Sequence, residues 1–185
     1  MAAALARNGL TWEATLNEGG WANGDVYRVS RDGAPLVLKT YLARSAPFRA
    51  MGRYLLRRER AAYEALRGVT GVPALAAFDD HASLLIEHVD AEKISNALLA
   101  ERGPPIVASL QQVLQDVHAR GVYHMDLRNQ GNILVAADSS TYIVDFASAV
   151  IVRGGHPGAR LLAGLCLKFD RYGVSKWVER ARDLG

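Results

Sequence analysis

The sequence predicts an α+β protein with a β-rich first half and a mostly helical second half. Short apolar segments separated by turn residues fill residues 10 to 42, and apolar residues recur at helical spacing over residues 105 to 120. The expected order is strands, one helix, strands, helices, two short strands and helices. The 185 residues show no internal repeat or linker, so we expect one domain in two lobes.

The first half is predicted to be a β-meander followed by a helix and two more strands. Turn signals occur at residues 18–20, 23–24 and 31–33, around the apolar runs 26–29 and 35–38. Helical spacing predicts a helix over residues 52–67, which Gly68 and Pro73 end. Strands are expected at 75–78 and 84–89, with Asp79-Asp80-His81 as the turn between them.

In the second half, helices are predicted near 94–101 and over 105–120, and Gly121 ends the longer one. The longer helix has one apolar face, formed by Val107, Leu110, Val113, Leu114 and Val117. Two short strands follow at 132–136 and 141–146, and two helices are expected from there to the C-terminus.

Composition narrows the class of protein. Cys166 is the only cysteine, which excludes an intramolecular disulfide and a cysteine zinc cluster and favours a reducing, cytoplasmic location. No run approaches the roughly 18 apolar residues of a membrane span. The net charge of +3 suits an anionic ligand. The basic residues of the C-terminal fifth outnumber the acidic ones: Arg153, Arg160, Lys168, Arg171, Lys176, Arg180 and Arg182 against Asp170, Glu179 and Asp183.

The strongest candidate site lies in two segments, residues 124–135 (HMDLRNQGNILV) and 142–147 (YIVDFA). Phosphoryl transfer needs a carboxylate near the attacking hydroxyl and oxygen ligands that hold Mg²⁺ against the triphosphate. Asp126 could supply the first, and Asn132 and Asp145 the second. Each segment alone is more typical of a surface turn or a strand end. Their joint placement beside predicted strands favours the catalytic interpretation.

These segments resemble the catalytic and metal-binding loops of protein kinases, and the resemblance covers about residues 16 to 150. It implies a protein-kinase-like bilobal fold with a β-rich N-lobe (about 10–89), a hinge (about 87–91) and a truncated helical C-lobe (about 92–185). It also implies transfer of the γ-phosphoryl group of ATP, with Mg²⁺ or Mn²⁺, to a hydroxyl group. The chain is similar to small divergent families, the RIO-type atypical kinases and the bacterial lipopolysaccharide core (Kdo/heptose) kinases.

The resemblance implies that Lys39 contacts the phosphates and pairs with a glutamate of the following helix. Glu59 is the expected partner and Glu64 the alternative, and the helical period lets only one of them face the site. It also implies a glycine-rich turn over the phosphates, formed by Gly19, Gly20 and Gly24 before Val26. Trp21 replaces the second glycine of the kinase pattern. An ordinary β-turn is the alternative.

Further roles follow from the same resemblance. The backbone from Glu87 to Val89 would bind adenine, with Val26, Val37 and Leu134 over its faces, although a buried edge strand would have the same pattern. Arg128 stands at the position of the catalytic-loop lysine. Its side chain would either contact the transferring phosphate or face solvent.

Several residues depart from the kinase pattern. Met125 replaces an arginine, which argues against regulation by activation-loop phosphorylation. Ala147 replaces a glycine, from which we expect a less mobile metal-binding segment. Asn132 lies one residue farther from Asp126 than in the kinase pattern. A bulge is therefore expected near residues 129–131, and Gly131 would permit it.

These features are compatible with two acceptors of the phosphoryl group: a protein hydroxyl, as in serine/threonine kinases, or a hydroxyl of a cell-envelope sugar. A pseudokinase-type nucleotide-binding module is the third interpretation, and no nucleic-acid partner is expected. In the basic tail, Trp177 and Val178 alternate with basic residues, which suggests peripheral contact with an anionic inner membrane surface. The alternative is a helix that packs four apolar residues into the C-lobe: Leu165, Phe169, Tyr172 and Trp177.

Overall fold

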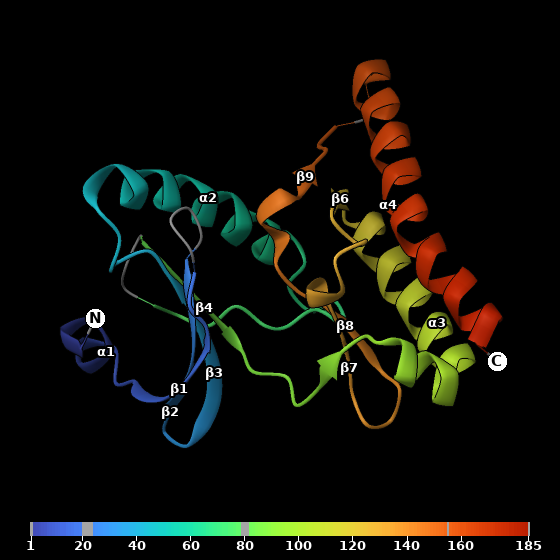
Figure 1. Cartoon of the computed structure of the whole chain (residues 1–185). Helices are drawn as coiled ribbons and strands as arrows, with labels where there is room; N and C mark the ends of the chain where they lie inside the picture. Colours follow the sequence, from blue (N-terminus) through green and yellow to red (C-terminus); the bar gives the residue numbers. More distant parts are fainter. Residues whose placement is uncertain (1, 20–23, 79–81, 155, 185) are drawn as a thin grey trace. The chain divides into compact units, whose positions relative to one another are not determined.

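The computed structural model describes residues 2–19, 24–78, 82–154 and 156–184. It confirms the α+β prediction: an antiparallel sheet and helices make up the fold (Figure 1). The chain divides into two compact units. The first unit contains Met1–Ala61 and Ala74–His88, and the second contains Ala62–Pro73 and Val89–Gly185.

The sheet of the first unit has the strand order β1-β2-β3-β4 and is antiparallel throughout, as the predicted meander requires. Its strands are β1 (Thr11–Asn17), β2 (Asp25–Arg31), β3 (Ala34–Thr40) and β4 (Ser83–Glu87). Between β2 and β3, Asp32 and Gly33 both have positive φ, 52° and 80°. This combination closes a two-residue hairpin whose twist matches that of the strands.

The two faces of this sheet carry different sets of side chains. One face carries the core of the unit, with Leu5 of α1 (Ala2–Arg7) packed among strand residues and their neighbours: Leu10, Val29, Leu38, Phe78 and Leu85. Side chains alternate along a strand, and register pairs Val26 with Lys39. Val26, Val37 and Lys39 therefore share the opposite face.

Helix α2 (Ala46–Ala65) begins earlier than the predicted residue 52. The carbonyl of Ser45 accepts the first helical hydrogen bond, from the N–H of Arg49 at 2.9 Å. Gly52 of α2 leaves room for the Tyr41 ring, because a Cβ at this position would come within 2.2 Å of that ring. The predicted strand at 75–78 is wrong: only Leu75 forms a bridge, to Ile86 of β4. The predicted turn 79–81 lies outside the described residues.

Residues 62–73, placed by sequence in the first lobe, belong to the second unit. The carbonyl of Gly71 accepts a hydrogen bond from the N–H of Ile143 at 2.8 Å. Gly71 has a φ of 83°, and a Cβ there would come within 2.3 Å of Val113. This close approach ties the loop after α2 to the second unit.

The two predicted helices near 94–101 and 105–120 are joined in α3 (Asn96–Ala119), with a kink at Arg102. Pro104 and Pro105 follow the kink, and proline cannot donate the backbone hydrogen bond of a helix interior. Five short strands form two small sheets, of order β5-β7-β8 and β6-β9. They are β5 (Glu92–Lys93), β6 (Val122–Tyr123), β7 (Ile133–Val135), β8 (Thr141–Ile143) and β9 (Val150–Ile151).

The strand predicted to reach Phe146 ends at Ile143 instead. Asp145 has a left-handed backbone, which no strand accommodates, and the short helix η2 (Phe146–Ser148) follows it. Another 3₁₀ turn, η1 (Gln130–Asn132), precedes β7.

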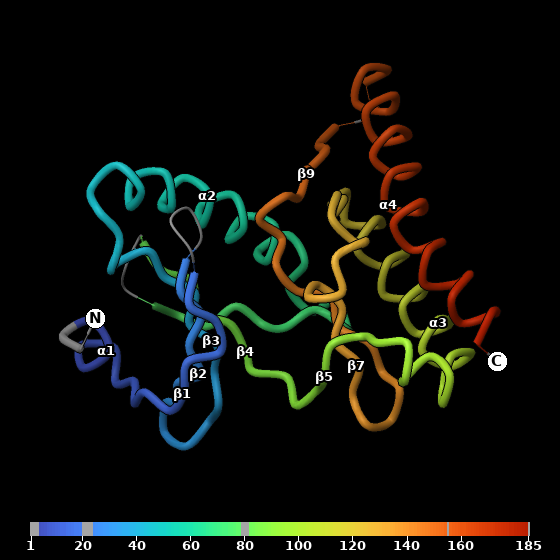
Figure 2. Tube along the Cα trace, viewed as in Figure 1, coloured from blue at the N-terminus to red at the C-terminus, as the bar shows by residue number. Residues whose placement is uncertain are grey.

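The C-terminal segment forms one helix, α4 (Pro157–Leu184), rather than the two expected. Figure 2 shows it beside α3 in the second unit. Gly173 of α4 allows a close approach to Leu127, because a Cβ at this position would lie only 3.2 Å from the Cβ of Leu127. Of the side chains expected to pack into the lobe, Trp177 is buried, whereas Leu165, Phe169 and Tyr172 are exposed. Among the described residues, no helix is both long and apolar enough to cross a membrane.

Candidate functional site

In the second unit, Asp126 and Asn132 form a hydrogen-bonded pair in the loop after β6. The side-chain nitrogen Nδ2 of Asn132 donates to the Asp126 carboxylate oxygen Oδ2 and to its backbone carbonyl, both at 2.9 Å. Between them, where a bulge was expected, the chain forms the 3₁₀ turn η1, and the Asn129 side chain accepts from the N–H of Gly131 at 3.0 Å. Gly131 is not among the residues with positive φ, so its conformational freedom is not what permits this turn.

Two residues of the predicted catalytic segments have a left-handed backbone. Met125 has a φ of 67° and Asp145 a φ of 62°. The other described non-glycine residues with positive φ, Asp32 and Ser139, lie in turns. Aspartate tolerates this conformation, but for methionine it costs about 1–3 kcal/mol and persists only where surrounding contacts impose it.

The contact that imposes this conformation on Met125 comes from Asp170 of α4, which is completely buried. Its carboxylate accepts from the backbone N–H groups of His124 and Met125 at 2.8 and 2.7 Å. It also accepts from His118 Nε2 at 2.9 Å. Sequence reasoning missed this role, because it counted Asp170 only as one acid of the basic tail.

Two further residues of α4 bind the same loop. The indole N–H of Trp177 donates to the carbonyl of Leu127 at 2.8 Å, and Lys176 Nζ donates to the carbonyl of Arg128 at 2.8 Å. Together with Asp170, they fix the backbone from residue 124 to 128 to α4. The signal available in the sequence was a lone carboxylate at helical spacing from Cys166, Gly173 and Trp177.

His124 is buried and lies directly before this strained residue. Its Nε2 bonds to the carbonyl of Val144 at 3.0 Å, and its Nδ1 accepts from the N–H of Asp126 at 3.3 Å. This pattern assigns the proton to Nε2 and keeps the ring neutral. Burial lowers the pKa of His124 below its usual 6.5.

We expect the free energy of unfolding to fall as the pH drops below about 6.5. There the unfolded chain binds a proton at His124 while the folded protein does not, and the loss continues down to the lowered pKa of the folded state. NMR titration of the His124 ring measures that pKa. A midpoint at or above 6.5 would contradict the prediction, and in the His124→Asn variant this part of the pH dependence should disappear.

Asp145 follows β8 and is exposed, with its backbone fixed by two aromatic residues. Its N–H donates to the Tyr63 hydroxyl at 3.3 Å. The buried Phe146 ring lies 5.1 Å from the Tyr63 ring and 4.9 Å from that of His124. The Asp145 Oδ1 atom accepts from Ala147 N at 3.4 Å. Tyr63 is a second residue that sequence reasoning missed.

Asn132, in the loop after β6, and Asp145, after β8, carry oxygen atoms of the kind that bind Mg²⁺ or Mn²⁺. Because the Asn132 nitrogen makes both hydrogen bonds to Asp126, its amide oxygen is left to act as a ligand, together with the Asp145 carboxylate. Among the described residues, no three His, Cys, Asp or Glu side chains gather as a metal site. Mg²⁺ is commonly held by one or two carboxylates plus phosphate oxygens and water. Asn132 and Asp145 would hold the ion, which would neutralise charge on the phosphates.

In the first unit, Lys39 and Glu59 form the predicted ion pair. Lys39 Nζ lies 2.9 Å from Glu59 Oε2, and Glu59 is only 2% exposed. The alternative partner Glu64 is exposed. Val26 and Val37 lie on the same sheet face as Lys39, so β2 and β3 present an ammonium group beside two aliphatic side chains.

Lys39→Met is expected to lower the free energy of unfolding by about 2–3 kcal/mol, because it removes the ammonium group that lies 2.9 Å from the buried Glu59 carboxylate. The double variant Lys39→Met/Glu59→Gln should recover part of that loss. Denaturant unfolding measures both, with Lys93→Met, at an exposed lysine, as the control that changes little. A double variant that is less stable than Lys39→Met alone would contradict this account.

The described residues on either side of the glycine segment, Gly19 and Asp25, are joined by contacts that sequence reasoning missed. The carboxylate of Asp25 accepts from the N–H of Gly19 at 3.1 Å and pairs with Arg44 at 2.5 Å. Arg44 also donates to the carbonyl of Gly19. Gly24 is required by packing, since a Cβ there would lie 2.9 Å from the Tyr41 ring. The predicted phosphate-binding residue Gly20, and Trp21, lie outside the described residues.

The remaining predicted ligand residues are placed as follows. The N–H of Glu87 donates to the carbonyl of Ala74 at 2.8 Å, so it is not a donor for a base. Val89 directly follows His88, where the first unit ends, and Leu134 is half-buried in β7 of the second unit. The guanidinium of Arg128 lies over the Tyr172 ring, 5.2 Å from its centroid, on the surface.

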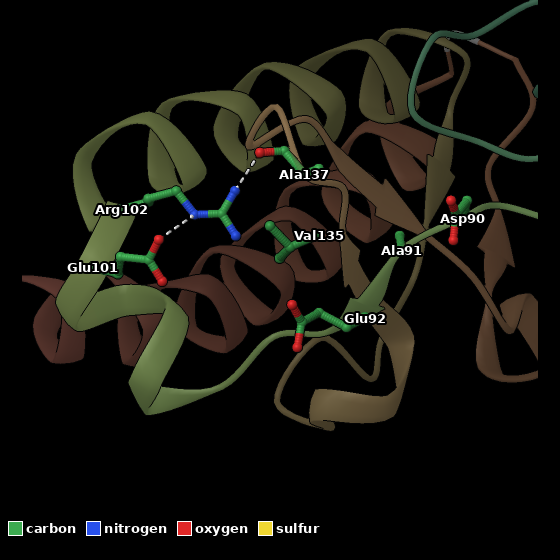
Figure 3. A pocket seen from close by; sticks show the side chains of 7 residues that line it. All are labelled: Asp90, Ala91, Glu92, Glu101, Arg102, Val135 and Ala137. Atoms are coloured by element: carbon green, nitrogen blue, oxygen red, sulfur yellow. Dashed lines mark hydrogen bonds and ion pairs between the residues drawn. The ribbon is translucent and has the colours of Figure 1, made fainter.

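Figure 3 shows a pocket of the second unit that sequence reasoning did not find. Its volume is about 530 Å³, and it is lined by Asp90, Ala91, Glu92, Glu101, Arg102, Val135 and Ala137. Arg102 reaches the carbonyl of Ala137 at 2.5 Å and the carboxylate of Glu101 at 3.6 Å. Asp90 and Ala91 belong to the predicted hinge, about 87–91, so that segment supplies part of the pocket lining.

The sequence matches no model of a known protein family, and none of the curated proteins compared with it is significantly similar.

Proposed function

We propose that this protein is an ATP-dependent kinase with a protein-kinase-like bilobal fold, which transfers the γ-phosphoryl group to a hydroxyl of its acceptor. The observation that carries the proposal is the Asn132–Asp126 hydrogen bond within a loop whose strained residue, Met125, is bonded to the buried Asp170. Backbone strain maintained by buried contacts is typical of functional sites.

Each predicted residue has a role in this proposal. Asp126 accepts the proton of the attacking hydroxyl, and its bond to Asn132 fixes the orientation of the carboxylate. Asn132 and Asp145 hold the divalent ion, and Lys39, oriented by Glu59, contacts the phosphates of ATP. Val26 and Val37 supply apolar surface for the adenine.

The acceptor is proposed to be a serine or threonine hydroxyl of a protein or a hydroxyl of a cell-envelope sugar, phosphorylated on the cytoplasmic side, where ATP is present. The pocket beside Asp90 contains three carboxylates and one guanidinium. Such a lining favours a ligand rich in hydroxyl groups over an anionic one.

A nucleotide-binding module without chemistry is the second candidate. Arg128 favours it, because its guanidinium lies over Tyr172 and not in the role of a phosphate contact. Ala147 and Met125, which replace kinase residues, also favour it. The two candidates differ in turnover.

Saturating Mg·ATP is expected to raise the melting temperature of both a kinase and a binding module. At 100 times the dissociation constant, ligand linkage adds about 2.7 kcal/mol. The Asp145→Asn variant should lose the part of this shift that depends on Mg²⁺. Asp138→Asn, at an exposed turn aspartate, should keep it.

ATP consumption measured in parallel separates the candidates. Stabilisation with turnover supports the kinase, and stabilisation without turnover supports the module. The absence of any shift with Mg·ATP would contradict both.

A further inference from the structure

Helix α4 exposes a row of large apolar side chains, here called the α4 stripe. Its members are exposed to 69, 45, 58, 48 and 62%, in the order Leu161, Leu162, Leu165, Phe169 and Tyr172. These values are unlike those of the buried residues of the same helix, such as Cys166 at 3% and Trp177 at 1%. Scattered exposed apolar residues are ordinary, but a contiguous row marks an interaction surface.

The geometry of a helix makes the stripe continuous. At about 100° per residue, Leu161, Leu165 and Tyr172 project within about 40° of one another, over a length of about 16 Å. The residues packed into the second unit, among them Cys166 and Asp170, project from another face. Figure 1 shows the first turns of α4 extending past the end of α3, and Leu161, Leu162 and Leu165 of these turns are exposed.

The charges beside the stripe all have one sign. Between residues 157 and 176 the basic residues are Arg160, Lys168, Arg171 and Lys176, and the sole acidic residue is Asp170. Asp170 is completely buried and accepts hydrogen bonds from the catalytic loop. This part of α4 therefore presents cations and apolar groups to solvent, without an exposed carboxylate.

We propose that the α4 stripe binds the surface of an anionic lipid bilayer, with the first half of α4 lying in the plane of the interface. Apolar side chains would enter the boundary between headgroups and acyl chains, while Lys168 and Arg171 extend to the headgroup phosphates. A second copy of the chain is a poorer occupant, because a symmetric contact would bring the same cations face to face.

This surface differs from the one that the sequence suggested. Trp177 is buried and donates to Leu127, so it does not insert into lipid. Contact through the α4 stripe does not depend on phosphoryl transfer, so an Asp126→Asn variant should bind vesicles as the wild type does.

Co-sedimentation with vesicles tests the proposal, using phosphatidylcholine with and without phosphatidylglycerol at low salt. Wild-type protein should pellet with the anionic vesicles and not with the zwitterionic ones. Leu165→Glu/Phe169→Glu and Lys168→Glu/Arg171→Glu should each lower the partition coefficient by about tenfold or more. The control is Tyr54→Glu on α2, since Tyr54 is 60% exposed, close to the value of Tyr172, and this variant should bind as the wild type does.

All variants change exposed side chains, so their melting temperatures should match that of the wild type. Absence of wild-type binding to anionic vesicles would overturn the proposal, as would equal binding to both kinds of vesicle. It would also be overturned if the wild type forms dimers that Leu165→Glu/Phe169→Glu dissociates while vesicles are not bound.

Discussion

Asp126→Asn is expected to lower the rate of phosphoryl transfer by about 10²–10⁴-fold and to leave the affinity for Mg·ATP nearly unchanged. The amide has the shape of the carboxylate and can still accept the hydrogen bond from Asn132 Nδ2. It cannot accept the proton of the attacking hydroxyl. The measurement is turnover of ATP together with the thermal shift caused by Mg·ATP.

The control for this variant is Asp138→Asn, because Asp138 is an exposed aspartate in a turn of the same unit. Its turnover should equal that of the wild type. An Asp126→Asn protein that binds Mg·ATP and turns it over at the wild-type rate would remove Asp126 from the proposed chemistry.

Asp170→Ala is expected to lower the free energy of unfolding by about 3–5 kcal/mol, the largest stability loss that we predict. The substitution leaves the N–H groups of His124 and Met125 without their acceptor in a buried site. Asp170→Asn should cost less, because its amide oxygen still accepts one of these bonds. Denaturant unfolding measures the difference, and Glu179→Ala, at an exposed position of α4, is the matched control.

Activity distinguishes a positioning role of Asp170 from a merely structural one. Asp170→Asn protein that remains folded should turn over ATP more slowly with unchanged affinity, because Met125 can leave its left-handed conformation. If folded Asp170→Asn protein keeps the wild-type rate, Asp170 stabilises the fold without positioning Asp126.

The sequence predicted the features that depend on local pattern. The meander of β1 to β3 follows from alternation and turn residues. The helical period showed that only one of Glu59 and Glu64 could pair with Lys39, and the spacing expected from the kinase resemblance favoured Glu59. The end of α3 just before Gly121, whose φ is 69°, is likewise a local property of the chain.

Features set by contacts distant in sequence could not be predicted in the same way. Asp170 accepts from His124, 46 residues earlier in the chain. Asp25 and Arg44 pair across 19 residues. No local pattern specifies such partners, and the short strands β5, β6 and β9 depend on tertiary contacts for the same reason.

Helix α4 shows how periodicity can favour the wrong face. Leu165, Phe169 and Tyr172, which were expected to be buried together with Trp177, repeat at helical spacing, and so do Cys166, Asp170 and Trp177. Hydrophobicity favours the first set as the core, yet the second is buried because Asp170 and Trp177 bind the backbone of residues 124–127. Because Asp170 is charged, the sequence pattern does not indicate that its face of the helix is the buried one.

The most direct measurement of the central proposal is transfer of label from γ-labelled Mg·ATP in a cell extract, with separate counting of protein, lipid and saccharide fractions. We predict that wild-type protein labels one fraction and that Asp126→Asn protein labels none above background. Equal labelling by the two proteins, or no labelling by wild-type protein that demonstrably binds Mg·ATP, would contradict the account.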